Sequence, residues 1–99
     1  MIDGYLLNIR VFNDVSDSKG QALKPLEEAA EVFGAWQKCD DMRYATMTIR
    51  EAFREDLIDE CVDTVQAAAN MLAAVGATQG EVDAAIKRMD ERNGDRGRL

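Results

Sequence analysis

The chain of 99 residues has no histidine, and that absence removes several kinds of active site. Zinc sites built on histidine, imidazole general bases and the Glu-x-x-His pattern of di-iron bundles are all excluded. Aromatic side chains are also scarce, because Trp, Tyr and Phe make up 6% of the chain. Much of the apolar content is alanine, so the core is thin for a monomer. We therefore expect a homo-oligomer, in which a second copy covers part of each amphipathic helix.

Cysteines and long apolar runs are few as well. Cys39 and Cys61 stand 22 positions apart, a spacing that matches no metal or redox motif. Two free thiols without a signal peptide predict a reducing, cytoplasmic location. The longest apolar stretch, residues 67–77, is interrupted by Asn70 and Gly76 and is too short to cross a bilayer.

Positive charge is in short supply too. The formal net charge is −7, which argues against binding to a nucleic-acid polymer, because phosphate backbones require patches of Lys and Arg. The distribution is uneven. Residues 1–85 carry 7 basic and 16 acidic side chains, whereas residues 86–99 carry 5 basic and 3 acidic ones. The basic tail is suited to contact a small anion.

The first half of the chain predicts one short and one long helix within a single domain, residues 1–99. Residues 1–12 have an ambiguous period, and we favour a short helix because a lone strand would have no partner. Residues 13–21 read as a loop. A helix begins near Ala22, with Pro25 in its first turn. Its apolar face comprises Leu26, Ala29, Ala30, Phe33 and Trp36.

The second half predicts a long and a short helix. A capping box, Thr48 to Glu51, opens a helix of about 27 residues that ends at Gly76. A second capping box, Thr78 to Glu81, opens a helix that Asn93 and Gly94 stop. The long helix has an apolar stripe of Phe53, Leu57, Cys61, Val65, Ala68, Leu72 and Val75. The predicted fold is all-α: an antiparallel helical hairpin plus two shorter helices, assembling into an oligomeric helical bundle.

Two acidic pairs stand out within the two long helices. Glu28 and Glu31, like Glu60 and Asp63, are spaced i, i+3 and so share one face of their helix. If the chain folds back in the non-periodic stretch 39–48, all four carboxylates arrive at one level. They would repel one another unless a cation joins them. Oxygen-only clusters suit Mg²⁺ or Mn²⁺, and Mg²⁺ suits phosphate chemistry.

These residues resemble the signature of the MazG-like, all-α nucleoside triphosphate pyrophosphohydrolases. Lys24–Val32 is similar to the first motif helix of that family, and Glu55–Val65 is similar to the second. Glu91–Gly97 resembles a basic segment that often ends such domains. The resemblance covers roughly residues 20–97, the motif core.

The resemblance implies a Mg²⁺-dependent enzyme, with Mn²⁺ as an alternative metal. Such an enzyme converts a (d)NTP to the monophosphate and pyrophosphate through attack by a metal-activated water. The resemblance further implies a homodimer or homotetramer. It also implies four metal ligands: Glu28, Glu31, Glu60 and Asp63. Glu27 more readily faces outward or supports the site.

The chemistry then suggests roles for other side chains. With no histidine, a carboxylate must act as general base, and Glu31 and Asp63 are equal candidates. The candidates for binding substrate are Lys24, Asn70, Arg88, Arg92, Arg96 and Trp36. The lysine and arginines would neutralise phosphate, Asn70 would hydrogen-bond a base or ribose, and Trp36 would stack on a base.

Each of these assignments has a plainer alternative. Lys24 is also a suitable i, i+4 partner for Glu28, and Arg88 and Arg92 would complement the negative end of their helix. Trp36 is better suited to packing in the core or at an interface than to stacking on a base, and Asn70 is equally suited to a buried position in an interface. The competing functions are dUTP or phosphoribosyl-ATP pyrophosphohydrolysis, and a non-catalytic helical module for dimerisation or nucleotide sensing.

Overall fold

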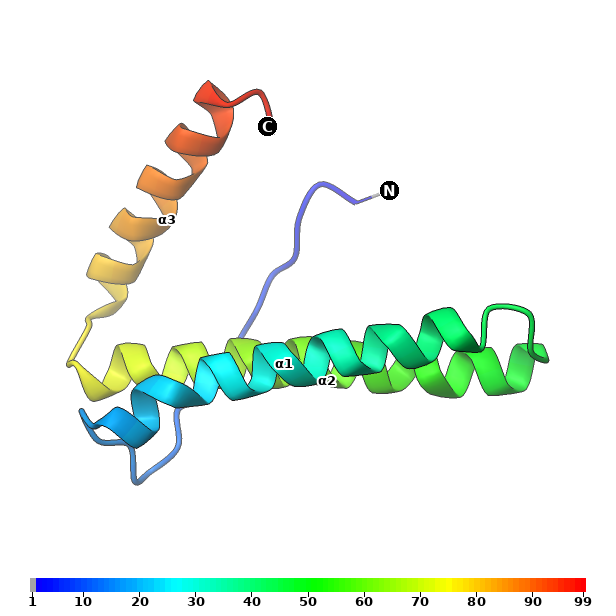
Figure 1. Cartoon of the computed structure of the whole chain (residues 1–99). Helices are drawn as coiled ribbons and strands as arrows, with labels where there is room; N and C mark the ends of the chain where they lie inside the picture. The colour runs from blue at the N-terminus through cyan, green and yellow to red at the C-terminus, as the bar shows by residue number, and fades with distance from the viewer. Residues whose placement is uncertain (1) are drawn as a thin grey trace.

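A computed structural model describes residues 2–99, and within them the fold is all-α, as predicted. The three helices are α1, Lys19–Asp41, α2, Met47–Ala74, and α3, Gln79–Asp95. No strand occurs among the described residues. Helices α1 and α2 run side by side in opposite directions, whereas α3 leaves the end of α2 at a steep angle (Figure 1). Of the helix pairs, only α1 and α2 are in contact.

Helices α1 and α2 meet along a seam with coiled-coil spacing. In each helix the residues turned toward the partner recur at alternating steps of four and three, which is the spacing of a heptad repeat. These positions are Gln21, Pro25, Glu28, Val32, Ala35 and Cys39 in α1, and Phe53, Leu57, Glu60, Thr64, Ala67, Met71 and Ala74 in α2. The Cys39 thiol donates a hydrogen bond of 3.2 Å to the Phe53 carbonyl and fixes the register near the connection.

The helix ends follow capping chemistry, with two corrections to the predicted starts. Helix α1 begins at Lys19, where Ser18 Oγ accepts the Gln21 N–H at 3.3 Å, so Pro25 lies in the second turn and not the first. The proline ring at this position removes one N–H from the helix ladder.

The predicted capping box at Thr48 is also wrong. Thr46 caps α2 instead, because its Oγ1 accepts the Ile49 N–H at 3.4 Å. The other two signals are confirmed. Thr78 and Glu81 form a reciprocal capping box at the start of α3, and Gly76 follows α2 with φ +74°, a conformation that favours glycine.

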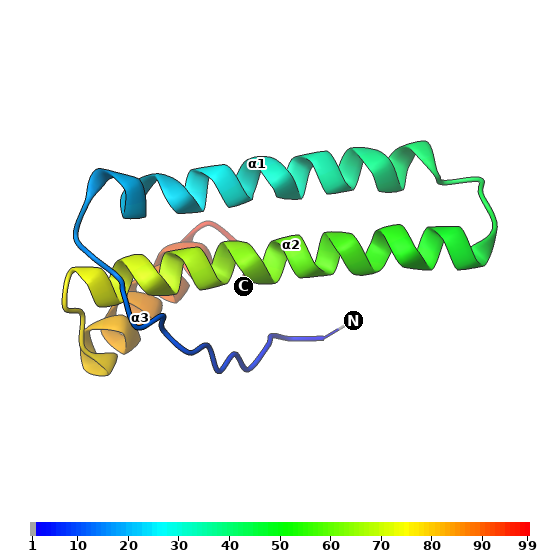
Figure 2. The ribbon, with the colours of Figure 1, turned by 90° about the horizontal axis from the view of Figure 1, so that it is seen from below.

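The predicted short helix in residues 1–12 is wrong for the described part of that segment, because residues 2–12 contain no helix. Gly4 and the β-branched Ile9 and Val11 have poor helix propensity. The segment extends away from the α1/α2 pair (Figure 1), passes below α2 in the view of Figure 2, and meets α2 near Arg10 and Phe12. Its backbone is held by two α2 side chains: Gln66 Nε2 donates to the Arg10 carbonyl at 2.6 Å, and the Phe12 N–H donates to Asn70 Oδ1 at 3.1 Å.

The predicted apolar face of α1 does not form the contact with α2, and of the predicted α2 stripe only Phe53 and Leu57 lie in the seam. Leu26 is 68% exposed and Phe33 is 59% exposed, because the seam passes through other positions. The α2 stripe from Cys61 to Val75 is likewise exposed. Only Ala67 and Asn70 are buried among the described residues. The apolar surface of both helices is therefore left without a partner in the single chain.

Membrane insertion through the helices has no support in the described part of the chain, where no helix combines the length and apolarity that a bilayer span requires.

Candidate functional site

Two glutamates interrupt the seam between α1 and α2. Glu28 and Glu60 occupy seam positions and are half-buried, whereas Glu31 and Asp63 lie one turn further along and are exposed. One carboxylate oxygen from each of Glu28, Glu60 and Asp63 lies within 4.8 Å of the others. The structure thus brings together three of the four predicted metal ligands, from both helices, at one level of the seam.

Two oxygen atoms in this cluster are buried without a partner. Neither Glu28 Oε2 nor Glu60 Oε2 accepts a hydrogen bond within residues 2–99. The ion pairs of the described chain join Lys24 to Glu27 and Arg43 to Asp40, so no basic side chain neutralises Glu28 or Glu60. An unpaired carboxylate oxygen withdrawn from water is costly, and the four negative charges add repulsion.

The burial and crowding of these carboxylates raise the pKa values of both seam glutamates. Desolvation raises the pKa of Glu28 above its ordinary value, and the neighbouring Glu31 carboxyl adds to the effect. For Glu60, a hydrogen bond with the Glu31 carboxyl raises the pKa most, followed by desolvation and the charges of Glu31 and Asp63. Glu31 is therefore close enough to act on both seam glutamates. All four predicted ligands belong to one electrostatic unit, which we call the acidic cluster.

The acidic cluster lies between two cavities. The first, of about 620 Å³, includes Glu28 and Asp63 in its wall and extends to Phe12 and Asn70. The second, of about 510 Å³, includes Glu31, Glu60 and Asp63. Asp63 lines both cavities, so a ligand in either one can reach the acidic cluster.

Two of the predicted substrate-binding residues line the first cavity. Lys24 is one of them, although its Nζ also pairs with Glu27 Oε2 at 3.1 Å. A hydrogen bond and the charge of Glu27 raise the pKa of Lys24, so the side chain stays positive. Asn70 is the other, and it is 3% exposed.

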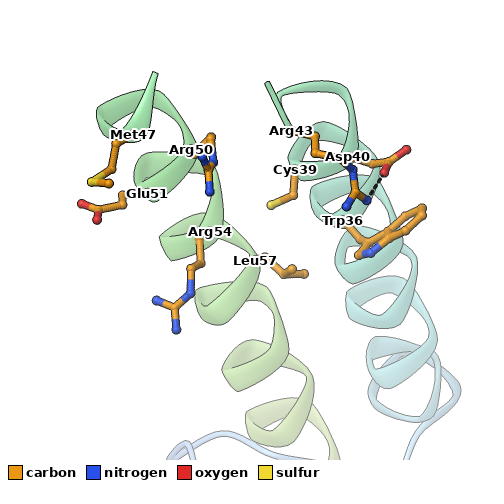
Figure 3. Close-up of a pocket in the computed structure, with 9 residues that line it drawn as sticks. All are labelled: Trp36, Cys39, Asp40, Arg43, Met47, Arg50, Glu51, Arg54 and Leu57. Carbon is orange, nitrogen blue, oxygen red and sulfur yellow. Dashed lines mark hydrogen bonds and ion pairs between the residues drawn. The ribbon is translucent and has the colours of Figure 1, made fainter. Parts of the chain in front are cut away.

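Trp36 is not brought to the acidic cluster in the single chain. It stacks on Phe33, with ring centroids 6.0 Å apart, and lines a cavity of about 490 Å³ near the connection between α1 and α2. Figure 3 shows this cavity, where Cys39 and Leu57 point toward the opposite helix. The plainer prediction for Trp36, packing against other side chains, fits its stacking on Phe33.

The three basic candidates of the tail also lie apart. Arg88 and Arg92 belong to α3, and Arg96 follows directly as its C-cap. Because α3 contacts neither α1 nor α2, these arginines cannot act on the acidic cluster of their own chain in this arrangement.

Sequence reasoning missed Phe12 and Gln66, which complete the first cavity. The signal for Gln66 was available, since it precedes Asn70 by four residues and two amides at that spacing share a helix face. Phe12 gave no such signal, because its place depends on a tertiary hydrogen bond to a residue 58 positions away.

Comparison with known proteins adds no assignment: no family model, no curated protein and no solved structure matches this chain. The molecule is therefore classed by its own features, as an all-α protein with an acidic cluster between two cavities.

Proposed function

We propose that this chain is a Mg²⁺-dependent nucleoside triphosphate pyrophosphohydrolase. The observation that carries the proposal is the pair of buried, unpartnered oxygens on Glu28 and Glu60, in a group of three carboxylates that Asp63 completes. A cation is the partner that such oxygens lack. The order and spacing of the acidic pairs support the same reaction, through their resemblance to the MazG-like enzymes.

The donor set favours a hard divalent metal. Every candidate ligand is a carboxylate oxygen, and the cluster has no sulfur or nitrogen donor, which suits Mg²⁺ or Mn²⁺. When bound, such an ion supplies charge neutralisation for phosphate oxygens and lowers the pKa of water. Glu28 and Glu60 would hold it from the seam, with Asp63 and Glu31 on the exposed side.

The chain's own residues then divide the remaining work. Glu31 and Asp63 are exposed carboxylates beside the cavities, so either is placed to accept a proton from an attacking water. Lys24 lines the first cavity, where its ammonium group favours a phosphate. The products of such a reaction are the nucleoside monophosphate and pyrophosphate.

We also propose that the working unit is a homodimer or a larger homo-oligomer. The chain exposes 8162 Å², whereas a folded monomer of 11.0 kDa exposes about 5,600 Å². The excess, roughly 2,500 Å² per chain, is of the size that obligate homodimers bury. The free Cys39 and Cys61 fit a reducing compartment such as the cytoplasm.

A non-catalytic dimerisation module would explain the exposed apolar faces equally well. It gives no role, however, to the unpartnered oxygens of Glu28 and Glu60, which a module selected only for association would replace with apolar residues. The enzyme accounts for both features, so we favour it.

The test is a pyrophosphate-release assay with the eight common NTPs and dNTPs and with dUTP, in Mg²⁺, in Mn²⁺ and in EDTA. Phosphoribosyl-ATP serves as an additional substrate. The proposal requires release of pyrophosphate and monophosphate that depends on the metal. A folded protein that releases neither product from any substrate would contradict it.

A further inference from the structure

The first cavity connects the acidic cluster to a buried amide. Its wall combines the N-terminal segment at Phe12, α1 at Lys24 and Glu28, and α2 at Asp63 and Asn70. A volume of about 620 Å³ lies within the range of pockets that hold small organic ligands. A nucleotide whose phosphates lie at Glu28 and Asp63 would therefore extend its base toward Asn70.

Asn70 is the one buried polar side chain of the described residues. Its Oδ1 accepts two hydrogen bonds, from the Phe12 N–H at 3.1 Å and from Gln66 Nε2 at 3.0 Å. Gln66 Nε2 also donates to the Arg10 carbonyl, at 2.6 Å. Two amides on one face of α2 thus hold the backbone of the N-terminal segment.

The polarity of that backbone fixes the orientation of both amides. A backbone N–H at Phe12 only donates, so it must meet the oxygen of Asn70. A carbonyl at Arg10 only accepts, so it must meet the nitrogen of Gln66. The Asn70 Nδ2 group is left with two hydrogens, and it donates to no group of residues 2–99. Asn70, which lines the first cavity, therefore presents hydrogen-bond donors and no free acceptor to a ligand there.

We propose that Asn70 selects the base of the nucleotide by requiring a carbonyl oxygen, so that a 4-oxo pyrimidine binds better than its 4-amino counterpart. A carbonyl oxygen accepts a hydrogen bond from the free Nδ2 hydrogens of Asn70. An exocyclic amine presents hydrogens of its own, so the Nδ2 donors are left without an acceptor. Buried donors without a partner penalise a ligand strongly, and hydrogen-bonding sites discriminate more sharply than apolar ones. This inference rests on the proposed function, because it places the phosphates at the acidic cluster.

The experiment compares dUTP and dCTP, whose bases differ in the 4-oxo or 4-amino group and in the hydrogen that uracil carries on N3. Binding of their non-hydrolysable α,β-imido analogues is measured by calorimetry with the full chain in Mg²⁺. We expect the uracil analogue to bind about 10-fold more tightly. The substitution Asn70→Asp replaces the donor with an acceptor while keeping an oxygen for the Phe12 N–H. It should abolish or reverse the preference.

Gln66→Ala is the second variant and tests the orientation. Without Gln66 Nε2, the Arg10 carbonyl and Asn70 Oδ1 each lose a donor, so the N-terminal segment and the Phe12 N–H that orients Asn70 are held less firmly. The preference should therefore shrink while Mg²⁺-dependent binding remains. Gln66 is thus a positioning residue, and the ratio of the two affinities is a readout that a merely structural role would leave unchanged.

The outcomes separate this inference from the proposed function. Equal Mg²⁺-dependent affinities for the two analogues, or a preference that survives both variants, would overturn the role of Asn70 and leave the metal site standing. Absence of Mn²⁺ binding to the unliganded protein, together with no Mg²⁺-dependent binding of either analogue, would overturn the proposed function and this inference with it.

Discussion

Helices α1 and α2 are packed against each other along a heptad seam, whereas α3 has an equally clear amphipathic pattern and contacts neither of them. The pair brings the carboxylates of Glu28, Glu60 and Asp63 within 4.8 Å of one another without help from another chain. The third helix, with Val82, Ile86 and Met89 on one side, has nothing to bury them against. The contrast shows that the acidic cluster is a property of one chain, whereas the apolar side of α3 is left without a partner in that chain.

The largest effect on activity is expected from substitutions within the acidic cluster. Glu60→Ala or Glu28→Ala should lower Mg²⁺-dependent pyrophosphate release by more than about 100-fold, beyond what loss of an outer-shell partner costs. The same variants should melt at a higher temperature than the native protein in EDTA, because a buried like charge is gone.

Glu27→Ala is the matched control for that experiment. Glu27 is the neighbour of Glu28 in sequence but pairs with Lys24 in solvent, so its loss should leave the activity within a few-fold of native. Glu60→Gln with undiminished pyrophosphate release would show that the cluster is not the metal site.

The second largest effect is expected on the oligomeric state, when exposed apolar side chains of α1 and α3 are replaced by charged ones. Ile86→Glu in α3 and Phe33→Asp in α1 should shift the protein toward monomers in analytical ultracentrifugation. The melting temperature of the native protein should rise with its concentration, as for any obligate oligomer. Tyr44→Asp is the control, because Tyr44 is also an exposed apolar side chain, at 96%, but lies in the connection between α1 and α2. A native protein that sediments as a monomer at all concentrations would contradict the proposed assembly.

Much of this contrast could be predicted from the sequence. The capping box at Thr78 and the glycine after α2 are local signals, and the structure confirms both. The i, i+3 carboxylate pairs are local signals too, and the structure brings three of their four carboxylates together. The faces were not predicted correctly. Leu26 and Phe33 follow a convincing apolar pattern, yet the seam passes through Glu28 and Val32 and leaves the first two side chains exposed. The helical pattern alone does not say which face meets which partner.

A third and smaller effect is expected from the arginines of α3. Arg88→Gln and Arg92→Gln should raise KM several-fold with little change in kcat if these side chains neutralise phosphate in the site of a partner copy. Mixing an inactive Glu60→Gln protein with a double arginine variant should then restore part of the lost activity, since some sites would be complete. Unchanged kinetics in the arginine variants would assign them to the C-terminal end of the helix instead.

The acidic cluster should also make the stability of the folded protein depend on pH. The pKa values of Glu28 and Glu60 are raised in the folded protein above the ordinary 4.5, so the folded state binds protons more tightly than the unfolded state. The free energy of unfolding should therefore rise as the pH falls through these raised values toward 4.5. In thermal melts with EDTA, the native protein should gain stability on moving from pH 7 toward pH 5, and excess Mg²⁺ at pH 7 should reduce that gain. Glu60→Gln should flatten the profile, and a flat native profile would contradict the raised pKa values.

The smallest effect, on the free energy of unfolding, is expected from replacing the glycines at the ends of α2 and α3. Gly76 has φ +74°, so Gly76→Ala should cost about 1 kcal/mol of stability, the penalty for a side chain in the left-handed region. Gly94→Ala, within α3, should stabilise by a similar amount, because alanine has the higher helix propensity and no atom lies within 4 Å of the new methyl group. Chemical denaturation of both variants checks the two signs, and equal signs would mean that the two helix ends are assigned wrongly.

The position of Glu28 and Glu60 in the seam has a consequence for the lifetime of the protein. Two helices joined by a heptad seam separate most easily where the seam is interrupted, and here the interruption is two carboxylates whose buried oxygens have no hydrogen-bond partner. Under the proposed function, a bound cation would join them. In a metal-poor solution that middle section would open more often, exposing its backbone to proteases. The concentration of free divalent metal would thereby govern how long each molecule persists as well as how fast it reacts.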